Sequence, residues 1–186
     1  MKPWTRLDST TVVRDRWIRL RADRCRLANG ELIEPYYVME EPDWIHIVAV
    51  NDDGRMVLVH QYRHAAAITS IEFPGGIIDA GESPADAAAR ELLEETGFQA
   101  RDWHPVASFF ANPARQTNRV HVFLAHGLTS AAAQKLDATE DITCSAATVD
   151  EIKAMINDGR FSHGLNIASF HLALAIMATL SNLDKA

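Results

Sequence analysis

The stretch that decides the fold, residues 73–97, reads FPGGIIDAGESPADAAARELLEETG. Ser83 is a residue type that caps helix N-termini, and Pro84 suits the first helical position. The residues that follow are mostly strong helix formers, and Gly97 is typical of the left-handed residue that ends a helix. These local signals predict a single helix from Pro84 to Thr96.

The predicted helix carries a dense cluster of glutamates. Glu91 and Glu95 are four residues apart and share a face, and Glu94 lies one turn from Glu91. Like charges at this spacing destabilise a helix, and an Arg–Glu pair contributes only about 0.3 kcal/mol. Arg90 can reach Glu94 and, backwards, Asp86, but one arginine cannot offset the whole cluster. A hard cation that takes oxygen ligands, Mg²⁺ or Mn²⁺, can offset it; the alternative is a solvated helix face.

The residues before the helix favour the metal site over the solvated face. Gly75 and Gly76 permit close backbone approach or unusual dihedral angles, and Glu82 lies just before the cap. A glycine loop beside a helix N-terminus can also receive phosphate, although this loop lacks the lysine of a P-loop.

The spacing of these residues matches a known pattern. From Gly76 the order is glycine, five residues, Glu82, seven residues, and then RELLEETGF at residues 90–98. This order resembles the Nudix box, G-x5-E-x7-R-E-U-x-E-E-x-G-U, in which U is a bulky apolar residue, and it matches at every specified position. The resemblance implies a hydrolase that cleaves a nucleoside diphosphate linked to another group. It also implies an α/β Nudix fold, in which a mixed β-sheet is sandwiched between α-helices.

The resemblance further implies roles for the residues of the box. The ligands of the metal, Mg²⁺ or alternatively Mn²⁺, would be the carbonyl of Gly75 and the carboxylates of Glu82, Glu91 and Glu95. Arg90 would orient these carboxylates, and Glu94 would be a supporting carboxylate. Two or three bound ions would bridge the diphosphate and lower the pKa of a bound water, whose attack releases a nucleoside monophosphate and a sugar phosphate.

A second acidic segment lies far from the box in the sequence. Residues 136–142, LDATEDI, resemble the loop that closes the site in one Nudix subfamily. Glu140 aligns there with a metal-binding or base-positioning glutamate, so it joins Arg90 and Glu94 as a catalytic candidate. The alternative interpretation of this segment is a solvated acidic turn.

The substrate class is suggested by the residues on both sides of the box. Residues 57–76, VLVHQYRHAAAITSIEFPGG, resemble the same segment of ADP-ribose and nucleotide-sugar pyrophosphatases. Pro113, sixteen residues after Gly97, resembles a mark of ADP-ribose pyrophosphatases, but their usual Ser-Pro-Gly is here Asn-Pro-Ala. This departure favours a broader nucleoside diphosphate sugar hydrolase. The candidate substrate-binding residues are Arg63, Glu72, Pro113 and Arg115, although both arginines could equally be plain surface residues.

The remaining chain predicts strands before and after the box, with helices at the end. Residues 17–27 alternate apolar and polar side chains, and Asn29-Gly30 is a turn before a second strand at residues 31–40. Pro35 makes that second strand an edge strand or splits it. The apolar runs WIHIVAV and MVLVHQYR, joined by Asn-Asp-Asp-Gly, predict another hairpin. Further elements are expected as strands at residues 104–111 and 120–128 and as helices at residues 148–159 and 165–180.

The composition bounds the class of protein. The chain has 186 residues, 47% of them apolar, 23% of them charged, and a formal net charge of −7. This is ordinary globular composition, without the basic field that nucleic acid attracts. Cys25 and Cys144 are expected to be free and buried. No secretory signal or membrane-spanning stretch is visible, so a cytoplasmic protein without membrane or nucleic-acid partners is expected.

Two regions are expected, and rival functions stay open. Residues 1–43 would form an N-terminal strand region that mediates a homodimer, as the resemblance implies, and residues 44–186 would form the Nudix hydrolase domain. The rival substrates are a nucleoside triphosphate, a dinucleoside polyphosphate or a coenzyme. A binding module that senses ADP-ribose compounds is a further alternative, but such a regulator should carry a DNA-binding segment and often a degraded box. The preferred base and sugar cannot be read from the sequence.

Overall fold

The computed structural model of the protein describes residues 2–136 and 138–183. The chain divides into two compact units. The N-terminal unit comprises Met1–Asp43 and Phe110–Arg119, and the Nudix-box unit comprises Trp44–Phe109 and Val120–Ala186.

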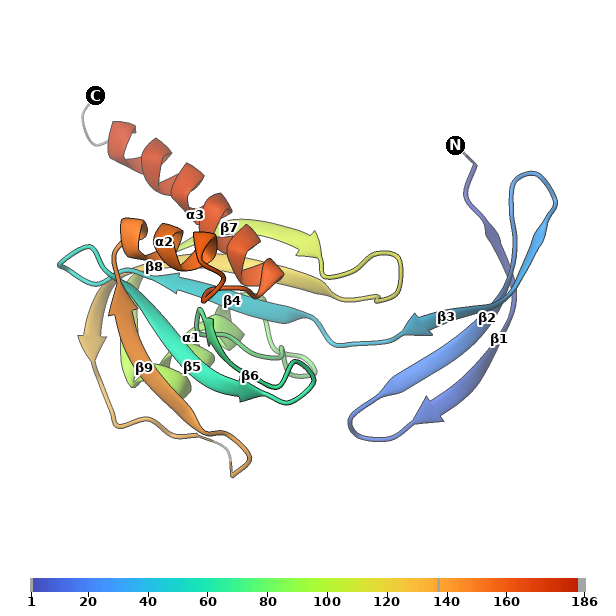
Figure 1. The fold of residues 1–186 in the computed structure, drawn as a ribbon, viewed down its shortest axis with the longest axis horizontal. Helices are drawn as coiled ribbons and strands as arrows, with labels where there is room; N and C mark the ends of the chain where they lie inside the picture. The colour runs from blue at the N-terminus through green and yellow to red at the C-terminus, as the bar shows by residue number, and fades with distance from the viewer. Residues whose placement is uncertain (1, 137, 184–186) are drawn as a thin grey trace. The chain divides into compact units, whose positions relative to one another are not determined.

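The N-terminal unit contains one antiparallel sheet of three strands, β1 (Thr5–Arg14), β2 (Arg19–Arg26) and β3 (Leu32–Met39), in the order β1-β2-β3 (Figure 1). Strands β2 and β3 lie where the alternating pattern predicts them. Pro35 is on β3, an edge strand of this sheet, as its missing N–H requires. Strand β1 was not predicted, because all of its side chains are exposed and leave no one-sided apolar pattern.

The segment from Phe110 to Arg119 belongs to the N-terminal unit, although the predicted boundary placed it with the later domain. Its backbone pairs with the end of β3: Met39 N–H donates to the Arg115 carbonyl at 2.8 Å, and Thr117 N–H donates to the Met39 carbonyl at 3.2 Å. The Tyr36 hydroxyl also donates to the carbonyl of Ala114. Because these partners are more than seventy residues apart, no local pattern could reveal the pairing.

The Nudix-box unit contains two sheets. One has the order β4-β8-β7, built from β4 (Trp44–Ala49), β8 (Arg119–Ser130) and β7 (Phe98–Phe110), with β4 and β8 parallel. The other has the order β6-β5-β9, built from β6 (Ile68–Glu72), β5 (Met56–Arg63) and β9 (Ile142–Ala147), and it is antiparallel. Strand β9 was not predicted.

The predicted hairpin between residues 44–50 and 56–63 is wrong. The turn itself forms, with Gly54 N–H donating to the Asn51 carbonyl at 3.0 Å. Beyond a single bridge between Val50 and Met56, however, β4 pairs with β8 while β5 pairs with β6 and β9. A tight turn fixes the reversal of the chain but not the sheet that each strand joins.

The described residues of the unit also form three helices: α1 (Pro84–Thr96), α2 (Val149–Asn157) and α3 (Gly164–Leu183). The bounds of α1 are those predicted. The Ser83 hydroxyl accepts from Asp86 N–H at 3.1 Å, and Gly97 takes a left-handed φ of 73° while its N–H donates to the Leu93 carbonyl. Helix α2 begins at a capping box formed by Thr148 and Glu151.

Strand β4 lies between helix α1 and helix α3, which agrees with the predicted arrangement of a β-sheet between α-helices. Side chains alternate along a strand, and one face of β4 packs on α1 in a core of buried apolar residues: Ile45, Ile47, Ala49, Val57, Ala87, Ala88, Leu92, Phe123 and Ala125. His46, on the opposite face, bonds Ser169 of α3. Figure 1 accordingly shows α1 on one side of β4 and α3 on the other.

The two cysteines are both free, but only one is buried as predicted. Cys25 is buried, whereas Cys144 on β9 is exposed, and its thiol donates to the Glu95 backbone carbonyl at 3.3 Å. In the described part of the chain, no helix combines the length and the apolar character that crossing a membrane requires.

Candidate metal and substrate site

The segment Pro74–Gly76, here called the glycine turn, runs beside β4 and approaches α1. Ile47 N–H donates to the Pro74 carbonyl at 2.8 Å, and Ile45 N–H donates to the Gly76 carbonyl at 2.9 Å. Between these two bonds, Gly75 N–H points the other way and donates to the Glu95 carboxylate at 2.9 Å. The Pro74 and Gly76 carbonyls are thus both directed to β4, whereas the Gly75 N–H between them is directed to Glu95.

The glycine pair allows close approach rather than unusual dihedrals. A Cβ atom at Gly75 would collide with the Ile45 carbonyl oxygen, and a Cβ atom at Gly76 would collide with the Glu91 carboxylate. Neither glycine has a positive φ. The two positions therefore need glycine because the turn is pressed between β4 and a carboxylate of α1.

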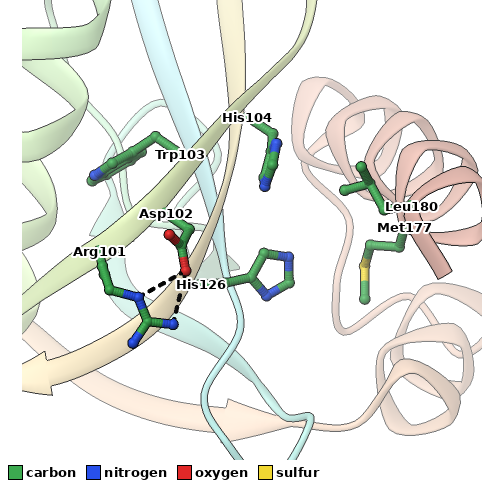
Figure 2. Close-up of a pocket in the computed structure, with 7 residues that line it drawn as sticks. All are labelled: Arg101, Asp102, Trp103, His104, His126, Met177 and Leu180. Atoms are coloured by element: carbon green, nitrogen blue, oxygen red, sulfur yellow. Dashed lines mark hydrogen bonds and ion pairs between the residues drawn. The ribbon is translucent and has the colours of Figure 1, made fainter. Parts of the chain in front are cut away.

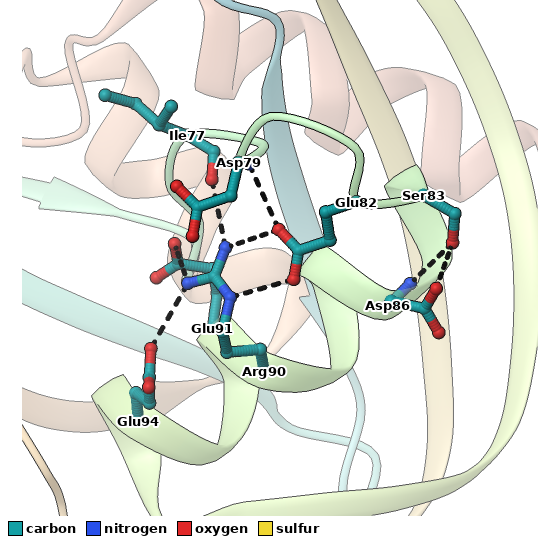
Figure 3. Close-up of polar contacts among 8 residues, drawn as sticks. All are labelled: Ile77, Asp79, Glu82, Ser83, Asp86, Arg90, Glu91 and Glu94. Carbon is teal, nitrogen blue, oxygen red and sulfur yellow. Dashed lines mark hydrogen bonds and ion pairs between the residues drawn. The ribbon is translucent and has the colours of Figure 1, made fainter.

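Arg90 gathers three of the four box carboxylates (Figure 3). Its Nε and Nη2 donate to the two Glu82 oxygens at 2.9 and 2.8 Å, and its Nη1 donates to Glu91 at 2.7 Å and Glu94 at 3.2 Å. The predicted contact with Asp86 is not made, because that carboxylate accepts from the Ser83 hydroxyl at 2.6 Å. One arginine thus compensates more of the cluster than its spacing along the helix suggested.

Glu95 is the fourth box carboxylate, and it is not among the carboxylates that Arg90 bonds in the described structure. It is 3% exposed, and burial raises its pKa to about 8, with the charges of Glu91 and Glu140 adding to the effect against the opposing bond from Gly75 N–H. Burial likewise raises the pKa of Glu91, although Arg90 opposes the shift. Two neighbouring carboxylates that resist ionisation form an oxygen site that a divalent cation would stabilise.

These residues fit a hard divalent metal ion. Within residues 2–136 and 138–183, no three Asp, Glu, His or Cys side chains already converge as a metal cage. Mg²⁺ does not need such a cage, since it is usually bound through one or two carboxylates, water and substrate phosphate. Glu91, Glu95 and the Gly75 carbonyl supply only oxygen donors of the kind it prefers.

Glu140 is brought towards the box, although it is 45 positions beyond Glu95 in the sequence. Its charge raises the pKa of both Glu91 and Glu95, and that of Arg63. Glu140 itself is exposed. Its neighbour Asp137 lies outside the described residues.

Arg63 and Glu72 form a paired unit between β5 and β6. Arg63 donates to both oxygens of Glu72, at 2.9 and 2.6 Å, and Glu72 is 3% exposed. Burial opposes ionisation of Glu72, but the Arg63 bonds outweigh it and lower the pKa of the carboxyl. The charge of Glu95 also acts on Arg63, so the guanidinium lies within electrostatic range of the box carboxylates.

The other two substrate candidates, Pro113 and Arg115, lie in the 110–119 segment of the N-terminal unit. The Arg115 carbonyl is used by Met39 N–H, and Arg115 N–H donates to the Asn112 carbonyl at 3.0 Å. Their roles as substrate contacts stay predictions.

Sequence reasoning missed a polar group beside the glycine turn, in which His46, Asn166 and Ser169 are buried and His163 is partly buried. His46, His163, Asn166 and Ser169 connect β4 and the turn to the start of α3. The available signal was the pair Asn166 and Ser169, two polar residues one turn apart in the mostly apolar first half of helix α3.

A separate cavity of about 620 Å³ lies between β7, β8 and α3 (Figure 2). It is lined by Arg101, Asp102, Trp103, His104, His126, Met177 and Leu180. The rings of His104 and His126 meet edge to face with 6.2 Å between centroids, and burial lowers the pKa of His126. The residues predicted to bind metal or substrate, all of them described, do not line this cavity.

Comparison with known protein families supports the resemblance to the Nudix box. Residues 41–164 match the model of the NUDIX domain, and residues 4–39 match that of the nucleoside diphosphate sugar hydrolase N-terminal domain.

Curated relatives cover most of the chain. The methanol dehydrogenase activator of Bacillus methanolicus is 30% identical over 146 residues, which are 78% of each protein. The ADP-ribose pyrophosphatase of Bacillus subtilis is 30% identical over 140 residues, 75% of each. The ADP-ribose pyrophosphatase of Mycobacterium tuberculosis is 33% identical over 151 residues, 80% of this chain and 72% of the relative.

A solved structure supports the fold. The crystal structure of an ADP compounds hydrolase matches with a TM-score of 0.87 over 97% of both chains, at 24% identity.

Proposed function

The chain belongs to the Nudix family, and from this premise we propose that it hydrolyses the diphosphate linkage of ADP-ribose or another nucleoside diphosphate sugar. The products are a nucleoside monophosphate and a sugar phosphate. The observation that carries the proposal is the pair of box carboxylates that Arg90 does not fully compensate: Glu95, which accepts from the Gly75 N–H, and Glu91, which lies beside Gly76. The substrate class is supported by the second matched family and by the pyrophosphatases among the relatives.

Nudix hydrolases generally use divalent metal ions, and the proposed ion here is Mg²⁺, with Mn²⁺ as a substitute. Glu91, Glu95 and the Gly75 carbonyl would hold it. When bound, such an ion polarises phosphoryl oxygens and lowers the pKa of water. Glu82 remains a further candidate ligand, although both of its oxygens accept from Arg90 and would have to be released in part.

The protein's own side chains would prepare the site for this chemistry. Arg90 bonds Glu82 and Glu94 and holds one oxygen of Glu91 in place, which would fix the carboxylates before substrate arrives. The Glu140 carboxylate would accept a proton from the attacking water. Glu94, the most exposed of the four box carboxylates, is the other candidate for this role.

Arg63 would contact the diphosphate. Its guanidinium is half exposed, and the bidentate pair with Glu72 fixes its orientation. Pro113 and Arg115 are proposed as further substrate contacts. Arg63→Lys should therefore raise KM more than it lowers kcat, because a lysine cannot make the paired bonds.

We further propose that the N-terminal unit mediates a homodimer. Its first strand is exposed over its whole length, and the unit exposes several large apolar side chains: Trp4, Leu7, Val12, Val13, Trp17, Leu32 and Tyr37. Apolar surface of this kind is typical of a protein–protein interface. A monomeric mass by light scattering at micromolar concentration would refute the dimer. A cytoplasmic location is proposed as well, since the substrates are nucleotides.

A substrate panel tests the proposed function. Purified protein is incubated with Mg²⁺ and ADP-ribose, several nucleotide sugars, nucleoside triphosphates, dinucleoside polyphosphates and coenzymes, and phosphomonoester release is measured after added phosphatase. The highest kcat/KM is expected with ADP-ribose or a nucleotide sugar. A preference of an order of magnitude or more for triphosphates would overturn the substrate class but leave a Nudix hydrolase.

A further inference from the structure

The glycine turn is anchored from α3 as well as from β4. Phe73 N–H donates to the Oδ1 atom of Asn166 at 2.7 Å, and Asn166 is fully buried in the first turn of α3. The Phe73 ring is held from the same side, 5.5 Å from the Phe161 ring and 6.4 Å from the Phe170 ring between centroids. Both the backbone and the side chain of Phe73 are therefore held by residues in and just before helix α3.

The Asn166 amide has little freedom to turn. Since Oδ1 accepts from a backbone N–H, the amide must present its NH₂ group on the other side, where Nδ2 lies 3.1 Å from His163 Nδ1. His163 Nδ1 is then an acceptor, and its proton is on Nε2. A rotation of the amide would place its NH₂ group against the Phe73 N–H, so this bond sets the orientation of the amide, and the bond from Nδ2 to His163 Nδ1 supports it.

The anchored residue is two positions before a candidate metal donor. From Phe73 the chain passes Pro74, whose carbonyl bonds Ile47, and reaches Gly75, whose N–H meets the Glu95 carboxylate. A shift of residue 73 would be transmitted to Gly75, because only one residue, a proline with a fixed φ, separates them.

We propose that Asn166 is a positioning residue for the metal site: through Phe73 it sets the place of Gly75, and thereby of the Gly75 carbonyl and the Glu95 carboxylate. This inference rests on the proposed function, since it assumes that these two groups bind a divalent cation. Partners that orient metal ligands typically change metal affinity about 10–100-fold when they are removed.

The chain offers a matched control on the same helix. Ser169 lies one turn after Asn166, is equally buried, and accepts from His46 Nδ1 at 2.9 Å while its hydroxyl donates to the Leu165 carbonyl. It therefore joins α3 to β4 without contacting the turn. Ser169→Ala removes a buried bond of the same helix but leaves the Phe73 anchor intact.

The test measures Mn²⁺ binding to the metal-free protein by calorimetry, together with melting temperature, kcat and KM. Asn166→Leu should weaken Mn²⁺ binding about 10–100-fold and lower kcat, whereas Ser169→Ala should lower the melting temperature and leave the affinity for Mn²⁺ within about 3-fold. Asn166→Asp should restore the affinity to within about 3-fold, because its carboxylate still accepts from the Phe73 N–H.

The outcomes separate this inference from the function on which it rests. If the wild-type protein does not bind Mn²⁺, the proposed metal site itself is wrong. If the wild type binds and Asn166→Leu binds equally well, or if Ser169→Ala weakens binding as much, Asn166 has only a structural role. Should Asn166→Leu fail to fold, His163→Ala replaces it: binding must weaken in that variant and persist in Asn166→Asp, and an unchanged affinity in His163→Ala would overturn the proposal.

Discussion

The two ends of the glutamate cluster on α1 are built differently. At one end, Arg90 bonds Glu82, Glu91 and Glu94, and the arginine lowers the pKa of Glu82. At the other end, Glu95 is buried, accepts from the Gly75 N–H, and has a pKa raised to about 8. Glutamates on α1 and just before it thus serve two purposes. Arg90 balances Glu82 and Glu94 within the protein, whereas Glu95, together with the partly compensated Glu91, is proposed to take a cation from outside.

The largest effect is expected at the unbalanced end. Glu95→Gln should keep the fold and lower kcat by about 10²-fold or more, because a charged metal ligand is lost from the transition state. Steady-state kinetics at saturating Mg²⁺ measure this loss. Turnover near that of the wild type would show that Glu95 is not a ligand.

A somewhat smaller loss is expected when Glu140 is neutralised. Glu140→Gln should lower kcat about 10–100-fold with little change in KM, since the carboxylate is proposed to act on the attacking water. Its exposed neighbour Asp141 is the matched control. If Asp141→Asn gives the same small loss as Glu140→Gln, the loop acts only through its overall charge, and the base is unassigned.

At the end of the cluster that Arg90 bonds, the shape of the positively charged side chain should matter more than its charge. Arg90→Lys keeps the positive charge but cannot reach three carboxylates at once, so kcat/KM should fall about 10-fold. The measurement is kcat/KM with the preferred substrate over a range of Mg²⁺ concentrations. A lysine variant as active as the wild type would mean that charge alone holds this end together.

The smallest effect concerns the stability of the metal-free protein. A carboxyl with a folded-state pKa of about 8, raised from its usual 4.5, stabilises the fold fully below pH 4.5 and loses that contribution as the pH rises to about 8. Melting temperatures of the metal-free wild type should fall over this range. Glu95→Gln should flatten the curve and melt several degrees higher at pH 8, where about 1 kcal/mol corresponds to ~2–4 °C in a chain of this size. Parallel curves for the two proteins would mean that Glu95 ionises normally.

The sequence predicts the parts of this site whose signals are local. Helix α1 was predictable to the residue because Ser83 and Gly97 mark its ends within one short stretch. The need for two glycines was predictable, but which atoms press on them was not, since Ile45 and Glu91 approach them from β4 and α1.

Long-range pairing was the part that sequence reasoning could not supply. The parallel pairing of β4 with β8 and the attachment of residues 110–119 to β3 join segments that are about seventy-five residues apart, and no periodicity encodes the choice of partner. The same holds for Asn166, whose partner Phe73 is 93 positions away. Glu140 was found only through the resemblance of its loop to a known subfamily.

The contrast between the two ends of α1 is tested most directly by Mn²⁺ binding to the metal-free protein, measured by calorimetry for the wild type, Glu95→Gln and Glu94→Gln. The wild type should bind Mn²⁺, Glu95→Gln should bind at least about 10-fold more weakly, and Glu94→Gln should bind within about 3-fold of the wild type. Equal weakening in both variants, or a loss confined to Glu94→Gln, would contradict the assignment of the cation to the Glu95 end.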